Sequence, residues 1–182
     1  MVVVSMFAAA GGYFLARSLD PGVETVDRLP GPGAQAAPAA EDLLGQRRPG
    51  FTLQDSMGKQ VSASDFDGQI WLVNFWATWC APCVEEMPML SDLQLEYADK
   101  GVRILGIALD DPGRAREFAE NMSLQYPTLV GQADVAVTGR RYGNSTGMLP
   151  FSVLIDAAGI IRWTHLGALD REELQIQIQA LL

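Results

Sequence analysis

Two long stretches of the chain are almost wholly apolar, and they predict the central strands of a sheet. The first runs from Ile70 to Trp76, with Asn74 as its single polar residue, and the second runs from Val102 to Leu109. Runs of this kind, without alternation, are typical of strands that are buried on both faces. A third strand is expected over Pro127 to Val130.

Two further pairs of short strand-like segments predict β-hairpins. The run over residues 51–53 and the run over 60–62 flank the turn cluster Asp55-Ser-Met-Gly58. Later in the chain, Phe151 to Ile155 and Ile160 to Thr164 flank Asp156-Ala-Ala-Gly159. Turn residues between two strand-like runs are the usual signal of a hairpin.

Helical periodicity appears between these strands. Residues from Cys80 to about Ala98 predict a helix, and Pro88, inside that pattern, should kink it. Arg114 to Met122 predicts a short helix after an Asp-Pro-Gly turn, and a brief helix or turn is expected within 132–149.

A final helix should begin after Asp170, with Glu173 in the capping-box position. Its apolar face would carry Leu174, Ile178, Leu181 and Leu182. Strands alternating with helices and ending in a hairpin and a helix predict an α/β sandwich.

The N-terminus has a different composition from the rest of the chain. No charged side chain occurs before Arg17, so residues 1–19 are expected to be a membrane anchor or a signal segment. Ala8-Ala9-Ala10 resembles a cleavage site, but we favour an uncleaved anchor because little apolar sequence precedes it. A Pro-, Ala- and Gly-rich tether over 20–44 then leads to a domain over 45–182.

Charge excludes some classes of partner. The chain has 13 basic and 22 acidic side chains, a formal net charge of −9. An acidic surface without a basic stripe argues against nucleic-acid binding and against electrostatic docking on anionic lipid.

The candidate chemistry lies in the segment Trp79-Cys80-Ala81-Pro82-Cys83, which contains both cysteines of the chain. Cys80 follows the end of a central strand and should open the helix, where unpaired amides and the helix dipole stabilise a thiolate. Cys83 lies one turn further along, so the two sulfurs can form a reversible disulfide. We expect Cys80 to be the exposed attacking thiol and Cys83 the resolving thiol. Pro82 has no N–H and suits the first helical turn.

Three other interpretations of the pair stay open. A static disulfide is one, although so small a ring constrains the unfolded chain little. Half of a zinc site is another, but no second cysteine pair exists and His165 is the only histidine. The third is a pair of reduced cysteines in the core.

The segment from Val73 to Pro88, Val-Asn-Phe-Trp-Ala-Thr-Trp-Cys-Ala-Pro-Cys-Val-Glu-Glu-Met-Pro, resembles the thioredoxin superfamily, specifically its membrane-tethered TlpA/ResA-type thiol–disulfide oxidoreductases. Phe51-Thr-Leu53, the segment 64–68 and the stretch from Leu149 to Asp156 add to the resemblance, which spans about residues 45–182. It implies a thioredoxin-like three-layer sandwich, in which helices flank a central mixed β-sheet, here with an N-terminal β-hairpin.

The resemblance also implies roles for single residues. Glu86 matches the acidic residue of the extended motif and lies three residues after Cys83, so it is expected to exchange a proton with that thiol; its alternative is a solvated helix acid. Asn74 stands where thioredoxins proper carry a buried aspartate, and a hydrogen-bonded core amide is its alternative. Pro150 matches the family's cis-proline, which would leave the Leu149 backbone to pair with an extended substrate. Trp79 is expected to form an apolar wall beside Cys80, with plain core packing as its alternative.

The leading hypothesis is an extracytoplasmic, membrane-anchored reductase of exported cysteine proteins, with a role in cytochrome c maturation as one implication of the resemblance. A membrane thiol–disulfide carrier would supply electrons on the periplasmic side of a bacterial inner membrane, and no metal or organic cofactor is expected. Two rivals are a peroxiredoxin-like peroxidase and a tethered binding module with an inert disulfide.

Overall fold

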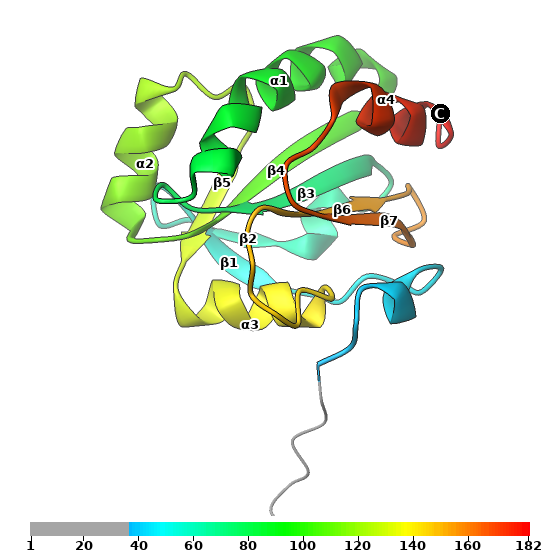
Figure 1. Cartoon of the computed structure of the whole chain (residues 1–182), viewed down its shortest axis with the longest axis horizontal. Coiled ribbons are helices and arrows are strands. Elements are labelled where there is room, and N and C mark those ends of the chain that lie inside the picture. Colours follow the sequence, from blue (N-terminus) through cyan, green and yellow to red (C-terminus); the bar gives the residue numbers. More distant parts are fainter. Residues whose placement is uncertain (1–36) are drawn as a thin grey trace, which may run out of the picture. The chain divides into compact units, whose positions relative to one another are not determined.

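The structure, a computed structural model, describes residues 37–182 (Figure 1). Its seven strands form one sheet in the order β2-β1-β5-β4-β3-β6-β7. The strands are β1 (Thr52–Asp55), β2 (Gln60–Ser62), β3 (Ile70–Trp76), β4 (Val102–Leu109), β5 (Thr128–Gly131), β6 (Phe151–Ile155) and β7 (Ile161–Leu166). The helices are α1 (Ala81–Tyr97), α2 (Pro112–Asn121), α3 (Ala133–Arg141) and α4 (Arg171–Gln179), with short 3-10 turns at Glu41–Leu43, Ala63–Phe66 and Ala98–Lys100.

Strand β3 is a fully buried interior strand of the sheet, as its apolar sequence predicts. All seven of its residues are buried. It pairs in parallel with β4 and antiparallel with β6, so the sheet is mixed. Because β3 ends at Trp76, shortly before Cys80, a fully buried interior strand leads into the candidate site.

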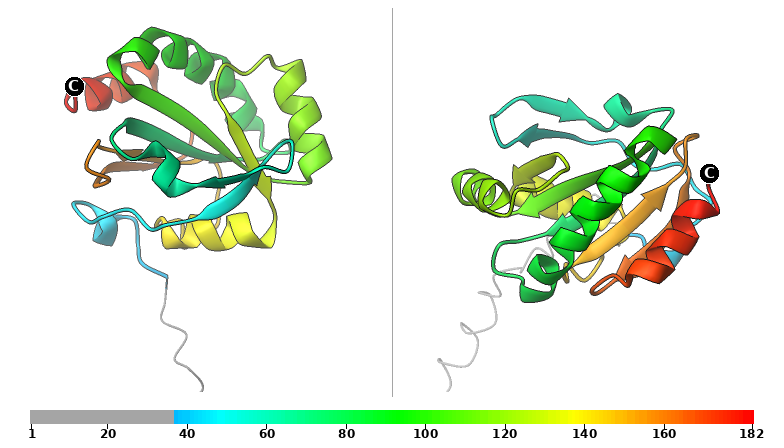
Figure 2. Two further views of the ribbon diagram at one scale, coloured as in Figure 1. Left: turned by 180° about the vertical axis from the view of Figure 1, so that it is seen from behind. Right: turned by 90° about the horizontal axis from the view of Figure 1, so that it is seen from above.

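Helices cover both faces of the sheet and give the expected three-layer sandwich. Leu90 of α1 and Leu174 of α4 pack in one apolar cluster, whereas Val135 of α3 packs in another on the opposite face. Figure 2 shows α1 and α4 on one side and α3 on the other. Helix α1 continues through Pro88, and its axis bends in Figure 1, in agreement with the expected kink.

The expected hairpins are both present, and the first of them has a pairing partner that the sequence did not predict. Strand β1 pairs with β2 and also, antiparallel, with β5, so the N-terminal hairpin extends the main sheet.

Helix α2 begins two residues earlier than predicted, because the side chain of Asp111 accepts hydrogen bonds from the N–H groups of Gly113 and Arg114.

The last helix corrects two details of the prediction. Asp170 accepts a hydrogen bond from the Glu173 N–H, which is half of the expected capping box; the described residues show no return bond from the Glu173 side chain. The helix ends at Gln179, and Leu182 is exposed, so it is not part of the apolar face. Leu174 and Ile178 alone are fully buried there.

The folded part of the chain takes in residues that the sequence assigns to the tether. Leu43 is buried in the core, and the Gly45 N–H donates to the Ile161 carbonyl. The expected anchor over 1–19 and the tether up to residue 36 lie outside the described residues. Within residues 37–182, no helix has both the length and the apolar character that a bilayer crossing requires.

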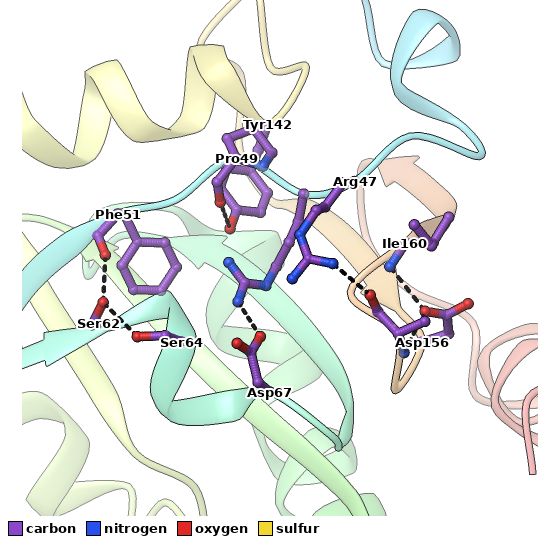
Figure 3. A network of polar contacts seen from close by, with 11 residues as sticks. Arg47, Pro49, Phe51, Ser62, Ser64, Asp67, Tyr142, Asp156 and Ile160 are labelled. Carbon is purple, nitrogen blue, oxygen red and sulfur yellow. Dashed lines mark hydrogen bonds and ion pairs between the residues drawn. The ribbon is translucent and has the colours of Figure 1, made fainter.

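A polar cluster fastens the start of the domain to the sheet (Figure 3). Arg48 pairs with Asp67, and its guanidinium lies 5.3 Å from the centre of the Trp71 ring. Tyr142 donates to the Pro49 carbonyl at 2.7 Å, and Arg47 donates to the Ala158 carbonyl at 3.2 Å. We call this set the Arg48 cluster.

Candidate active site

The two cysteines form a disulfide at the junction of β3 and α1. Cys80 is the N-cap of α1, and Cys83 lies in its first turn, with a Cα–Cα distance of 5.3 Å. Pro82 is within the first two helical positions, as expected. Cys80 is 6% exposed and Cys83 is fully buried. Cys80 is thus the more accessible sulfur, but in the oxidised state it is far less exposed than an attacking thiol was expected to be.

The disulfide packs in an apolar cluster that joins several elements. Trp76 of β3, Met87 of α1 and Ala108 of β4 belong to it, and Leu149 packs against it. Leu149 precedes a cis peptide bond to Pro150, which confirms the expected isomer. The fold therefore brings the Leu149–Pro150 segment to the cysteines, although about 70 residues separate them in the sequence.

Trp79 lies on the surface beside this cluster. Its side chain is 65% exposed, so it is not a core residue. It lines a shallow surface pocket together with Asp110, Asp111 and Arg114. A large exposed aromatic next to a reactive sulfur offers apolar contact area to a protein partner.

Asp110 holds the turn that precedes Cys80, and the sequence analysis did not identify it. It follows β4, and its Oδ2 accepts hydrogen bonds from the Thr78 N–H at 3.0 Å and the Thr78 hydroxyl at 2.6 Å. Burial alone would raise the pKa of Asp110, but the hydrogen bonds from Thr78 and Asp111 and the charge of Arg114 lower it below its ordinary value. Asp110 is therefore anionic, and its hydrogen bonds to Thr78 hold the active-site turn in place.

Glu86 is buried on α1, three residues after Cys83. It is 4% exposed, so the solvated-acid alternative is wrong. Its Oε1 accepts from the Asn74 Nδ2 at 2.7 Å, and its Oε2 accepts from the Leu169 N–H at 2.8 Å. These partners come from β3 and from the turn before α4, so three elements fix the position of the carboxyl.

Burial raises the pKa of Glu86 above its ordinary value of 4.5. The hydrogen bonds from Leu169 and Asn74 and the charge of His165 oppose that shift, but desolvation is the larger effect. A buried carboxyl with a raised pKa, one helical turn from Cys83, is a candidate acceptor for the proton of that thiol.

Asn74 connects this carboxyl to the sheet. Its Nδ2 also donates to the Ser152 hydroxyl at 3.0 Å, so the core-amide alternative describes its surroundings correctly. Sequence reasoning missed Ser152 and Leu169 as partners, because contacts across 78 and 83 residues leave no local pattern. A polar residue within an apolar strand, as at Asn74 and Ser152, was the only available signal.

Comparisons with known proteins agree on one kind of chemistry. The AhpC/TSA family profile matches residues 44–164. The thiol–disulfide oxidoreductase ResA of Geobacillus thermodenitrificans is 31% identical over 139 residues, which are 76% of this chain and 78% of that protein.

Solved structures extend the agreement to the fold. A Chlorobium tepidum protein assigned as thiol:disulfide interchange protein DsbE superposes with a TM-score of 0.69 at 31% identity, covering 76% of this chain and 96% of that one. A secreted disulfide oxidoreductase of Mycobacterium tuberculosis, homologous to E. coli DsbE, has a TM-score of 0.63 at 25% identity, covering 72% and 96%.

Proposed function

Because the chain belongs to the AhpC/TSA family and is related to the ResA-type thiol–disulfide oxidoreductases, we propose that it reduces disulfides of exported proteins through Cys80 and Cys83. One observation carries the proposal: the Cys80–Cys83 disulfide opens helix α1, and the carboxyl of Glu86 is buried one turn further along the same helix. Thiol–disulfide exchange needs an attacking sulfur, a neighbouring resolving sulfur and a group that takes up a proton.

The reaction would begin from the reduced dithiol. The Cys80 thiolate attacks one sulfur of the substrate disulfide, which forms a mixed disulfide and releases the first substrate thiolate. Cys83 then gives its proton to Glu86, and its thiolate attacks the Cys80 sulfur. The second substrate thiolate leaves, and the enzyme is left with the Cys80–Cys83 disulfide.

Trp79 and the Leu149–Pro150 segment would bind the substrate. Among the described residues, the Leu149 peptide group has no backbone hydrogen-bond partner. An extended substrate segment can pair with such a group as an added strand. The exposed ring of Trp79, next to Cys80 in the chain, would contact the same partner.

We place this chemistry outside the cytoplasm, with the N-terminal segment as a membrane anchor and a membrane thiol–disulfide carrier as the electron donor. The uncharged segment before Arg17 and the secreted M. tuberculosis relative support that setting. Apocytochrome c is one candidate substrate among exported cysteine proteins. Measuring the reduction potential against glutathione separates a reductant from an oxidant.

The direct test of the proposed function is Cys83→Ser. Without the resolving thiol, the mixed disulfide at Cys80 should persist, so incubation with a periplasmic extract should yield adducts that dithiothreitol releases. Cys80→Ser is the matched control and should form none. If Cys83→Ser forms no adducts with any disulfide protein, the exchange mechanism is wrong; turnover of peroxide by the wild type, without reduction of insulin, would instead favour the peroxidase alternative.

A further inference from the structure

One peptide group joins the only histidine of the chain to the buried carboxyl of Glu86. The His165 Nε2 lies 3.2 Å from the Ala168 carbonyl oxygen, and the Leu169 N–H donates to the Glu86 Oε2 at 2.8 Å. The Ala168 carbonyl and the Leu169 N–H belong to the same planar peptide bond and point to opposite sides of it. His165 and Glu86 are therefore connected by hydrogen bonds on the two sides of a single rigid unit.

The carbonyl determines which nitrogen of the His165 ring carries a hydrogen. A carbonyl oxygen can only accept, so the His165 Nε2 donates to it. A donor on a peptide carbonyl polarises the whole group and makes its N–H a stronger donor. Since the Leu169 N–H binds a carboxylate oxygen of Glu86, it stabilises the charged form of that carboxyl. His165 thus acts on the charge of Glu86 from the far side of the peptide.

The sheet holds His165 on the face that α1 covers. In the strand registers, His165 of β7 lies opposite Ser152 of β6, and Ser152 lies opposite Asn74 of β3. Residues directly opposite one another point to the same face of a sheet, and Asn74 contacts Glu86 on that face. The His165 ring also stacks on Trp163, with 5.3 Å between the ring centres. Strand β7 therefore fixes the imidazole beside the turn that precedes α4.

The groups that bind Glu86, act on it by charge or lie beside it come from several elements. Besides His165 of β7, they are Asn74 of β3, the Leu169 amide, Tyr126 before β5 and Cys83 of α1 itself. Asp170, the acid in the same turn as Leu169, caps α4 instead. Burial is the largest effect and raises the pKa of Glu86, whereas the charge of His165 is one of the effects that lower it. Of these groups, only the imidazole can add positive charge.

We propose that His165 is a positioning residue for the proton acceptor of the exchange reaction: through the Ala168–Leu169 peptide, it holds the carboxyl of Glu86 in place and favours the carboxylate. This inference rests on the proposed role of Glu86 as the acceptor of the Cys83 proton. His165 does not itself receive that proton. Its effect is to keep Glu86 ionised at a lower pH, so that the carboxylate is ready when Cys83 attacks the mixed disulfide.

The test compares His165→Phe with His165→Gln. Phenylalanine keeps an aromatic ring on Trp163 but removes the donor, whereas glutamine keeps an N–H donor for the Ala168 carbonyl and lacks the positive charge. We measure the pH–rate curve for the attack of Cys83 on the mixed disulfide. In His165→Phe its inflection should move up by about half a pH unit, which slows the reaction roughly threefold on the acidic side. His165→Gln should move it less.

Two controls separate this effect from a general loosening of the site. Thr164→Val changes the neighbouring residue of β7, which points to the opposite face, and should leave the pH–rate curve as in the wild type. In a Glu86→Gln background, His165→Phe should have no further effect on the curve, because an amide does not titrate. A shift of the same size in that background would mean that His165 acts on another group, and the inference would be wrong.

Infrared spectroscopy follows the Glu86 carboxyl directly and needs no disulfide substrate. The band of the protonated carboxyl is identified by its absence in Glu86→Gln, and its decrease with rising pH reports the titration of Glu86. This titration should move to higher pH in His165→Phe, and an unchanged titration would overturn the inference. If the titration moves and the rate of exchange does not follow it, the proposed role of Glu86 fails, whereas its link to His165 stands.

Discussion

Glu86 combines ionisable chemistry with almost complete burial on the helix that carries both cysteines. Its raised pKa means that folding favours the neutral carboxyl. The stability associated with Glu86 is therefore full below the ordinary value of 4.5 and is lost as the pH rises through the higher folded value. The burial that suits Glu86 to proton exchange therefore lowers the free energy of unfolding at neutral pH.

We expect Glu86→Gln to separate these two consequences. The variant should reduce disulfides about tenfold or more slowly, because it cannot accept the Cys83 proton. Its pH–rate curve should lose one inflection. Urea unfolding at pH 4 and pH 7 should show that wild type loses more stability over this range than Glu86→Gln does, because only the wild type has a buried carboxyl to ionise.

The exposed neighbour provides the control for this prediction. Glu85 lies on the solvent side of α1, so Glu85→Gln should change neither the pH–rate curve nor the pH dependence of unfolding. Coincident pH–rate curves for Glu86→Gln and wild type would remove Glu86 from the mechanism.

At the scale of single residues, spacing identified the cysteines and the family resemblance identified Glu86, but neither revealed the surroundings of these residues. The burial of Glu86 depends on β3 and on the turn before α4, which no local pattern connects. Asp110 was missed for the same reason: it is an ordinary acid after a strand until the fold places Thr78 beside it.

The ends of β3 and β4 form one unit with the start of α1. Asp110 at the end of β4 bonds the turn after β3, and Asp111 caps α2. Hydrogen bonds across adjacent strand ends thus fix the position of Cys80 without contacting its sulfur.

We expect Asp110→Ala to release this turn. The Thr78 N–H would lose its buried partner, which should destabilise the protein by about 1–3 kcal/mol. Since the pKa of Asp110 is lowered, its contribution is present above pH 3.8 and is lost as the pH falls through the folded value, so the difference from wild type should shrink in acid. Unfolding curves at pH 7 and pH 3 test this.

The same variant should also slow disulfide exchange, since Cys80 would no longer be held at the helix start. Asp92→Ala, at an exposed acid of α1, is the control for loss of one negative charge. An Asp110→Ala protein with wild-type stability at pH 7 would contradict the role of Asp110 in holding the turn before Cys80.

Periodicity predicted most elements to within two or three residues, because buried strands and amphipathic helices have distinct patterns. It failed where a side chain or a chain end decides the boundary, as at Asp111 and Leu182. The pairing of β1 with β5 was not predictable either, since neither strand carries a signal for a partner so far along the chain.

On the scale of the whole molecule, the Arg48 cluster and the cysteines are separate parts of the fold. Arg48 covers the Trp71 ring and pairs with Asp67, near the start of β3, whereas the cysteines follow the end of β3. The cluster therefore stabilises the domain without taking part in exchange.

We expect Arg48→Ala to lower the free energy of unfolding by about 1–2 kcal/mol, through the lost packing and cation–π contact of its buried guanidinium on Trp71. The reduction potential should stay unchanged, as measured by equilibration with glutathione. Arg47→Ala removes an exposed neighbour with one backbone contact and should have little effect on either quantity. A shifted potential in Arg48→Ala would show that the two parts are coupled.

The bond from the Leu169 amide to Glu86 makes the protein its own spectroscopic reporter. The amide proton touches a carboxyl 83 residues earlier in the chain, so its nuclear magnetic resonance frequency should follow the charge of that carboxyl. Proton uptake during exchange can then be watched at a backbone position that needs no label and no substitution, while both cysteines remain intact.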